Sequence, residues 1–200
     1  MICTLIPAKS FSDAKQRLSA VISPQERAAI ARNLLNRTLR TVRTAVGESP
    51  IMVVTDDAAV AEAAQTAGAD YGFVSEQEGL NGQLSHASLY APSSADLLVL
   101  HADLPLLVED DLHILLRSQT PVTIAPDRRG VGTNALLLRN GVRYFFFGED
   151  SAARHRQGAR LAGVMCDEVQ REGLSFDLDE EADWRDLPIA VRNQLYPDMV

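Results

Sequence analysis

Asp103 is the first residue to which a chemical role can be attached. It follows an apolar run of strand length, 96–100, and Pro105 prevents that strand from continuing. In open α/β sheets, ligands bind beyond the carboxyl ends of the strands, so a carboxylate here points into a candidate site. An aspartate after a strand is also a common turn former or helix cap, and on this stretch alone that alternative stays open.

Two more carboxylates, Asp177 and Asp179, precede the expected last helix and are candidates to share a site with Asp103. Carboxylates that meet without a cation repel each other, whereas Mg²⁺ takes one or two carboxylates together with substrate phosphates. The pattern therefore favours Mg²⁺. His101 and Asp103 form a His-X-Asp pair, but no histidine cluster accompanies it, which argues against zinc. The other histidines are expected at helix surfaces or core edges, namely His86, His113 and His155.

A basic loop follows the first expected strand of a chain whose formal net charge is −8. It contains Lys9, Lys15 and Arg17, which cannot all lie on one stripe of a helix. Nucleotide-binding α/β folds hold phosphates in the loop after the first strand, so we expect these cations to surround a polyphosphate. Solvated surface charge is the alternative.

Two glycine-bearing loops are candidates to hold a second anion. In the loop 127–134, two arginines stand close to Thr133, and an arginine fork matches phosphate or carboxylate. In the second loop, Gly148 ends an expected strand and Ser151 opens an expected helix, whose N–H groups attract anions. A wide hairpin turn and a plain helix cap are the alternatives.

The expected elements are those of an α/β chain. Apolar runs and capping signals predict, in the first half, strands at 2–6, 51–55, 71–74 and 96–100 and helices at 24–46, 57–67, 84–90 and 109–117. In this interpretation 76–83 is a polar loop. The second half is more mixed, with strands at 122–125, 135–138, 144–147 and 164–167, a further candidate strand at 174–178 and a helix at 150–161. This alternation predicts an α/β fold with a mixed, mainly parallel central sheet.

Composition limits the class of protein. The 200 residues, 46% hydrophobic and 23% charged, suit one folded domain over 1–200. The acidic charge argues against nucleic-acid binding, and no apolar run reaches the roughly 18 residues of a membrane helix. We also expect no signal peptide, and buried free thiols at Cys3 and Cys166, as in a reducing cytoplasm. The sequence leaves the oligomeric state open, a homo-oligomer included.

Six groups of short motifs follow one another over nearly the whole chain. They are Ile6-Pro7-Ala8-Lys9 with Ala14-Lys15-Gln16-Arg17-Leu18; Glu78-Gly79-Leu80-Asn81; Ala102-Asp103-Leu104-Pro105-Leu106-Leu107; Pro126-Asp127 with Gly132-Thr133-Asn134-Ala135-Leu136; Phe147-Gly148 with Ser151; and Asp177-Leu178-Asp179. With these motifs the sequence resembles the phosphoenolpyruvate or 2-phospho-L-lactate guanylyltransferases of coenzyme F-420 biosynthesis.

The resemblance implies a single-domain nucleotidyltransferase fold, glycosyltransferase-A-like and Rossmann-like. It implies transfer of GMP from GTP to the phosphate of a small phosphorylated acid, with release of pyrophosphate. The acceptor would be phosphoenolpyruvate, 2-phospho-L-lactate or 3-phospho-D-glycerate. His86 and His101 stand where relatives commonly carry small aliphatic or polar residues, which leaves the choice of acceptor open.

Site residues follow from the same resemblance. Asp103 would be one Mg²⁺ ligand and Asp177 or Asp179 another, with Lys9 and Lys15 beside Asp103 in catalysis. Lys9, Lys15 and Arg17 would bind the triphosphate of GTP, and Asn81 would lie near the nucleoside. The acceptor would be held by Thr133, Gly148 and Ser151.

Two alternatives remain at this stage. The first is a nucleotidyltransferase of the same fold for molybdenum-cofactor or sugar-nucleotide synthesis, but those enzymes usually open with a glycine-rich loop where this chain has Pro7-Ala8-Lys9-Ser10. The second is a non-catalytic nucleotide-binding domain, which would be expected to lack a carboxylate at 103, 177 or 179. None of these carboxylates is missing.

Overall fold

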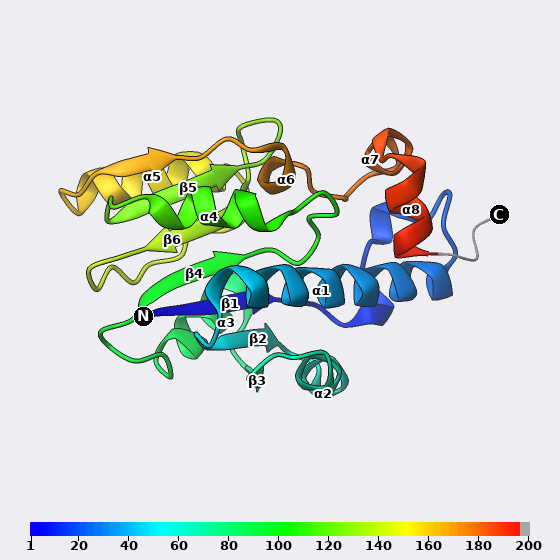
Figure 1. The fold of residues 1–200 in the computed structure, drawn as a ribbon, viewed down its shortest axis with the longest axis horizontal. Helices are drawn as coiled ribbons and strands as arrows, with labels where there is room; N and C mark the ends of the chain where they lie inside the picture. Colours follow the sequence, from blue (N-terminus) through cyan, green and yellow to red (C-terminus); the bar gives the residue numbers. More distant parts are fainter. Residues whose placement is uncertain (197–200) are drawn as a thin grey trace.

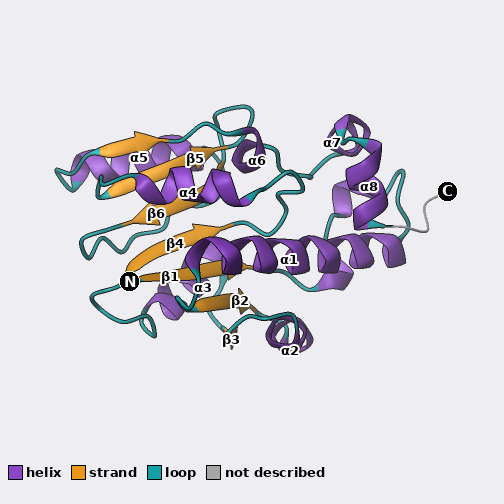
Figure 2. Ribbon diagram, viewed as in Figure 1, coloured by secondary structure: helices purple, strands orange, loops and turns teal. Residues whose placement is uncertain are grey.

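A computed structural model describes residues 1–196, and within them the strands form one seven-stranded sheet in the order β3-β2-β1-β4-β6-β5-β7 (Figures 1 and 2). The strands are β1 (Ile2–Pro7), β2 (Ile51–Thr55), β3 (Tyr71–Val74), β4 (Asp96–Leu100), β5 (Val122–Pro126), β6 (Thr133–Leu138) and β7 (Cys166–Glu168). All pairs are parallel except those of β6, which runs antiparallel to β4 and β5. The predicted mixed, mainly parallel sheet is confirmed.

The reversed direction of β6 matters for the site. Leu100, the last residue of β4, pairs with Ala135 near the start of β6. Pro126, at the end of β5, pairs with Thr133. The amino end of β6 therefore lies at the same edge of the sheet as the carboxyl ends of its neighbours. Residues that follow β4 and residues that begin β6 meet there.

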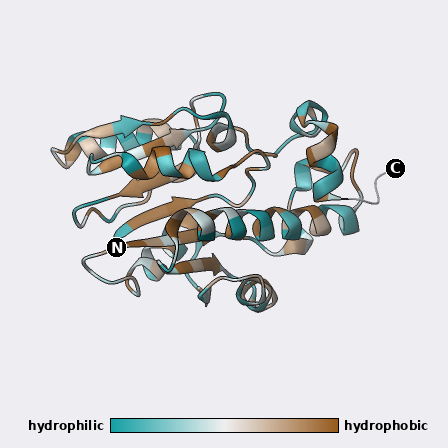
Figure 3. Cartoon of the chain, viewed as in Figure 1, coloured by the Kyte–Doolittle hydropathy of each residue, from teal (hydrophilic) through white to brown (hydrophobic). Residues whose placement is uncertain are grey.

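Helices cover both faces of the sheet, because side chains of each strand point alternately to opposite sides. On one face α1 (Pro24–Val46), α2 (Ala58–Thr66) and α4 (Glu109–Arg117) pack on strand residues such as Ile6 and Val53. On the other face α3 (Gly79–Ser88) and α5 (Ser151–Leu161) pack on residues such as Leu5 and Val54. The central strands β1, β2 and β4 between these layers are among the most hydrophobic parts of the ribbon (Figure 3).

The long helix α1 begins where the sequence predicts. The Ser23 hydroxyl accepts from the Glu26 N–H and the Glu26 carboxylate accepts from the Ser23 N–H, a reciprocal cap, with Pro24 as the first helical residue. The helix ends at Gly47, whose φ of 60° is unfavourable for residues with a Cβ. Leu35, Leu39 and Val42 of α1 belong to the apolar cluster that contains Ile6 of β1, so the second half of the helix packs on the sheet.

A third apolar cluster lies beyond the sheet, where α7 (Glu181–Asp186) and α8 (Ile189–Leu195) pack beside the first half of α1 (Figure 1). Leu18, Leu178 and Trp184 are buried in it. Leu18 belongs to the basic loop after β1, and Leu178 stands between the carboxylates Asp177 and Asp179. The cluster thus brings these two segments together.

Several predicted boundaries are wrong. The helix expected at 84–90 begins at Gly79, so 79–83 is helical and not a polar loop. The last strand is Cys166–Glu168 instead of 164–167. The candidate strand 174–178 is wrong: α6 (Glu172–Ser175) occupies its first part, and Phe176 follows in extended backbone.

The segment 144–147 was predicted as a strand and has no strand ladder in the structure. Its alternation is real, since Phe145 and Phe147 are buried and Phe146 is more exposed. Its backbone bonds to side chains instead: the Phe146 N–H donates to His155 Nε2 and the Phe147 N–H donates to Asn81 Oδ1. Side chains of α3 and α5 therefore replace a neighbouring strand.

Both cysteines are free thiols. Cys3 is buried as expected, but Cys166 is half-buried, because β7 lies at the outer edge of the sheet. Burial raises the pKa of the Cys3 thiol to about 11, which keeps it protonated at neutral pH. Within residues 1–196 no helix has the length and apolar character needed to cross a bilayer.

Candidate active site

A buried lysine lies between two of the predicted carboxylates. Lys15 Nζ is 2.7 Å from Asp103 Oδ2 and 3.2 Å from Asp179 Oδ1, and the Lys15 side chain is only 9% exposed. Burial opposes the charge of Lys15, but the two carboxylates outweigh it and raise the pKa of the ammonium. For Asp103, burial is likewise outweighed by Lys15, and the pKa of this carboxyl is lowered. Both groups are therefore ionised at neutral pH.

The backbone holds these groups in place. Lys15 has a φ of 55°, in the left-handed region, directly before the 3-10 turn η2 (Gln16–Leu18). A residue with a Cβ rarely adopts this conformation, so the surrounding contacts must maintain it. The N–H of Leu178 donates to the Asp103 carbonyl at 3.0 Å. This bond places Asp177 and Asp179 on either side of a residue tied to Asp103.

Asp177 experiences the charge of its neighbours. Burial, and then repulsion from Asp103 and Asp179, raise the pKa of Asp177 to about 6. Its Oδ1 accepts one long bond, at 3.4 Å, from Asn134 Nδ2. Asp103 Oδ1 is buried and has no hydrogen-bond partner among the described residues. Clustered carboxylates with an unpartnered oxygen are suited to a divalent cation.

The carboxylates do not make a complete metal site by themselves. Within residues 1–196, no group of three or more His, Cys, Asp or Glu side chains has the geometry to hold a metal ion. Mg²⁺ needs only one or two carboxylates when substrate phosphates and water supply the other oxygens. The residues present fit that kind of site.

The other two basic residues differ from Lys15. Lys9 is exposed, and Arg17 is exposed with its Nη1 3.9 Å from Asp179 and 3.7 Å from Glu180. Of the three predicted cations, only Lys15 is buried in the carboxylate cluster, and Arg17 approaches Asp179 from the exposed side. The role of Lys9 and Arg17 on a triphosphate stays a prediction.

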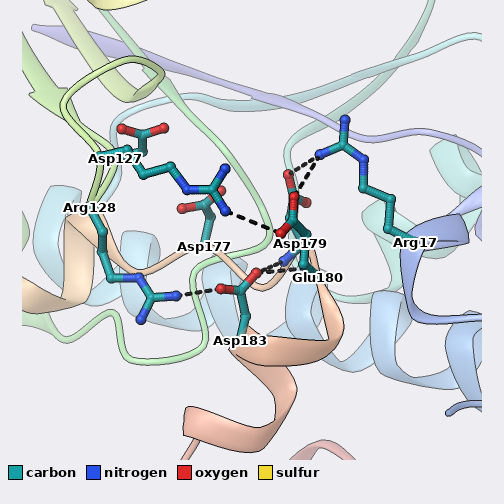
Figure 4. Close-up of a pocket in the computed structure, with 8 residues that line it drawn as sticks. Arg17, Asp127, Arg128, Asp177, Asp179, Glu180 and Asp183 are labelled. Atoms are coloured by element: carbon teal, nitrogen blue, oxygen red, sulfur yellow. Dashed lines mark hydrogen bonds and ion pairs between the residues drawn. The ribbon is translucent and has the colours of Figure 1, made fainter. Parts of the chain in front are cut away.

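A cleft beside this cluster is lined by charged side chains (Figure 4). The Arg128 guanidinium pairs with Asp183 and lies 4.0 Å from the centre of the Phe176 ring. Arg129 Nη2 is 3.1 Å from Glu180. Both arginines of the loop 127–134 thus contact the segment around α7. These acidic partners of the two arginines were not predicted from the sequence, although the acidic first turn of α7 was a signal for them.

The three predicted acceptor residues lie at two structural junctions. Thr133 begins β6 and is buried, and Ser151 begins α5 and is buried. Gly148, with a φ of 117°, makes the turn that leads into α5, a conformation that favours glycine. The N–H of Ala152 donates to the Val131 carbonyl, which ties α5 to the loop before β6.

Asn81 holds the backbone next to Gly148. Its Nδ2 donates to the Phe147 carbonyl at 2.9 Å, and its Oδ1 accepts from the Phe147 N–H at 2.8 Å. Its predicted place near the nucleoside remains a prediction, but the structure gives it a positioning role. The amide of an asparagine can both donate to and accept from one backbone residue, so its residue type allowed this role, but its sequence position did not indicate Phe147 as the partner.

Three of the histidines make more specific contacts than the sequence predicts. His155 is fully buried, not on a helix surface, and contacts Thr133 and Phe146. His86 Nδ1 is 3.1 Å from the Ser75 hydroxyl. The His101 ring lies 5.2 Å from the Phe147 ring, and its Nε2 is buried without a partner among the described residues. Sequence spacing carried no signal for these contacts, which join distant segments.

Strand order and covering helices define an α/β fold with a mixed, mainly parallel sheet. The fold is similar to that of a cytidylyltransferase from Leptospira borgpetersenii, with a TM-score of 0.57 and 13% identity, covering 92% of this chain and 83% of that one. A family model described as "Guanylyl transferase CofC like" matches residues 2–193. The chain belongs to this family.

Two relatives are similar over most of their length. A phosphoenolpyruvate guanylyltransferase from Rubrobacter xylanophilus is 38% identical over 188 residues, which is 91% of each chain. A 2-phospho-L-lactate guanylyltransferase from Methanothermobacter thermautotrophicus is 32% identical over 187 residues, covering 90% of this chain and 81% of that one. Both agree with the family resemblance of the sequence motifs.

Proposed function

We propose that this protein is a guanylyltransferase that moves GMP from GTP onto the phosphate of phosphoenolpyruvate or 2-phospho-L-lactate and releases pyrophosphate, in coenzyme F-420 biosynthesis. Membership of the CofC family and the two named relatives support this assignment. Relatives with both acceptors match at similar identity, so the acceptor is to be decided by experiment.

One observation carries the proposal at the level of this chain. Lys15 is buried against Asp103 and Asp179, and Asp177 stands in the same cluster. A buried cation among carboxylates lies here at the edge where α/β sheets bind ligands. Such a cation is suited to neutralise charge in a reaction between two polyanionic substrates. Lys15 can then exchange a carboxylate partner for a phosphate oxygen at little cost in charge balance.

The reaction requires position and charge neutralisation more than proton transfer. An oxygen of the acceptor phosphate attacks the α-phosphorus of GTP in line, the bond from that phosphorus to the bridging oxygen breaks, and pyrophosphate leaves. Because the acceptor is already an anion, no strong general base is needed. We assign the triphosphate to Lys9, Lys15 and Arg17 and the acceptor to Thr133, Gly148 and Ser151.

Asp103 and Asp177 would hold Mg²⁺. Asp103 has the buried unpartnered oxygen, and the repulsion that raises the pKa of Asp177 is the kind that a divalent cation relieves. Asp179 already contacts Lys15 and Arg17, so we assign it to positioning these cations. When bound, Mg²⁺ supplies neutralisation of the phosphate charge.

The chain-level organisation is part of the proposal. We treat residues 1–200 as a single domain, because one sheet and its covering helices span the described chain and the site draws on both halves of it. The two free thiols are compatible with a reducing compartment such as the cytoplasm.

Pyrophosphate release tests the proposal. The purified protein is incubated with GTP, MgCl₂ and phosphoenolpyruvate, 2-phospho-L-lactate or 3-phospho-D-glycerate in turn, with ATP and CTP as nucleotide controls. Release that requires GTP and one of the first two acids is the expected result. Asp103→Ala should fold and release none. Failure to release pyrophosphate with any of the three acids, or release that is unchanged in Asp103→Ala, contradicts the proposal.

A further inference from the structure

His155 connects two segments of the proposed acceptor site and belongs to none of the motifs assigned above. It lies on α5, has 0% exposure, and faces the buried aromatic side chains of the segment 144–147. Its ring is 5.0 Å from that of Phe147, in an edge-to-face arrangement. Its Nε2 is 3.1 Å from the Phe146 nitrogen and its Nδ1 is 3.1 Å from Thr133 Oγ1.

The two contacts determine where the ring carries its proton. Burial lowers the pKa of His155 to about 4, so the imidazole is neutral at physiological pH and has one N–H. A backbone N–H can only donate, so the Phe146 N–H requires Nε2 to be the bare, accepting nitrogen. The proton is therefore on Nδ1, and Nδ1 donates to Thr133 Oγ1. The Ser151 backbone is a second acceptor beside it and raises the pKa of His155, but by less than burial lowers it.

This tautomer restricts the Thr133 hydroxyl. A hydroxyl that receives a hydrogen bond from Nδ1 cannot direct its own hydrogen at that nitrogen. Thr133 is 3% exposed, and among the described residues its hydroxyl has no hydrogen-bond partner other than His155. Its hydrogen is thus available for an acceptor outside the pair, and an anionic ligand supplies one.

We infer that His155 is a positioning residue that directs the hydrogen of the Thr133 hydroxyl away from the imidazole and toward the phosphorylated acid. The inference rests on the proposed function, because it takes Thr133 as an acceptor-binding residue. It goes beyond that function by naming the residue that sets the direction of the bond. The Phe146 N–H holds the imidazole in one tautomer, and that tautomer leaves the hydrogen of the Thr133 hydroxyl available to an anion.

Two substitutions separate the two bonds of His155. The amide of His155→Asn reaches the position of Nδ1 and can still donate to Thr133, but not the position of Nε2. The amide oxygen of His155→Gln reaches the position of Nε2 and can still accept from Phe146, but leaves Thr133. Each variant loses one buried contact, so a purely structural role predicts similar losses of stability and similar kinetics.

The positioning role predicts unequal kinetics. His155→Gln should raise KM for the phosphorylated acid about 3- to 10-fold, with KM for GTP unchanged, because the Thr133 hydroxyl stays but loses the hydrogen bond that orients it. His155→Asn should give a KM closer to that of the wild type. In a Thr133→Val background, His155→Gln should add little, because the hydroxyl it controls is gone. Equal effects of both variants, or a matching rise in KM for GTP, would overturn the inference.

A measurement on the wild-type protein tests the tautomer without kinetics. Two-bond ¹H–¹⁵N spectra of the imidazole should show Nδ1 protonated and Nε2 bare from pH 5.5 to 8. An Nε2–H tautomer, or titration near pH 6.5, would overturn the inference whatever the activity. Failure of the wild type to release pyrophosphate refutes the proposed function itself, and release with unchanged acceptor KM in His155→Gln refutes only the role of His155.

Discussion

Replacing Asp177 by asparagine should stabilise the protein in the absence of divalent cations. The pKa of Asp177 is raised from 3.8 to about 6, first by burial and then by Asp103 and Asp179. At about 1.4 kcal/mol for each pKa unit, the full cost of ionising Asp177 at neutral pH is about 3 kcal/mol. Because the group is only partly buried, solvent screening reduces this to about 1–2 kcal/mol. Asparagine removes the charge and keeps an oxygen that can accept from Asn134.

The assay is thermal unfolding with EDTA at several pH values. For a chain of this size, about 1–2 kcal/mol corresponds to a rise in Tm of about 2–8 °C at pH 7.5. The sign follows from linkage: the folded-state pKa lies above the unfolded value, so the destabilisation is fully present above pH 6 and is lost as pH falls toward about 4. The advantage of Asp177→Asn should disappear over that range.

Two comparisons make the test specific. Asp167→Asn removes an exposed carboxylate at the outer strand and should leave Tm nearly unchanged at every pH. MgCl₂ should raise the Tm of the wild type and have a much smaller effect on Asp177→Asn. An Asp177→Asn protein that melts at or below the wild-type temperature at pH 7.5, or an advantage that grows as pH falls, would refute the reasoning.

Three further predictions concern other parts of the fold. Lys15→Met should abolish pyrophosphate release and lower the free energy of unfolding by about 1–3 kcal/mol at pH 7, because Asp103 loses its cation. Since Lys15 lowers the pKa of Asp103, urea unfolding should show this loss shrinking only below about pH 4. Asn81→Ala should lower the free energy of unfolding by about 1–2 kcal/mol and speed hydrogen exchange of the Phe147 amide, because the Phe147 N–H loses its acceptor. Unchanged exchange would contradict this role of Asn81. Gly72→Ala should lower the free energy of unfolding by about 1–3 kcal/mol or more, because its Cβ would lie 2.4 Å from the Ala61 carbonyl oxygen; a protein as stable as wild type would contradict this.

The regular part of the fold could be predicted from sequence because its signals are local. The apolar runs 51–55 and 96–100 become buried strands, and the Ser23 cap starts α1 where expected. Prediction failed where the backbone finds side-chain partners. The aromatic alternation at 144–147 indicated a strand, but Asn81 and His155 take the place of a ladder. Gly79 and Gly82 suggested a loop, and tertiary packing overrode that preference.

For the candidate site, the sequence singled out the carboxylates, the basic loop and the two glycine-bearing loops, and the family resemblance added Asn81 and the expected role of each residue. Position after a strand made Asp103 a candidate, because parallel strands end at one edge, and the other motifs were needed to favour a site over a turn or helix cap. It was not enough to predict that Lys15 turns inward while Arg17 stays exposed, since that depends on a left-handed residue and on contacts with Asp179. His155 was missed for the same reason, because its partners are distant in sequence.

The cluster around Lys15 also bears on how the chain folds. Lys15 is separated by 88 residues from Asp103 and by 164 from Asp179, so closing the cluster requires almost the whole chain. Contacts of such long sequence separation form slowly, and during synthesis Lys15 leaves the ribosome long before its second partner. The nascent chain can therefore complete β1 to β6 before this cluster closes. With the proposed site, we expect activity to appear only when the last segment arrives, and not when the sheet forms.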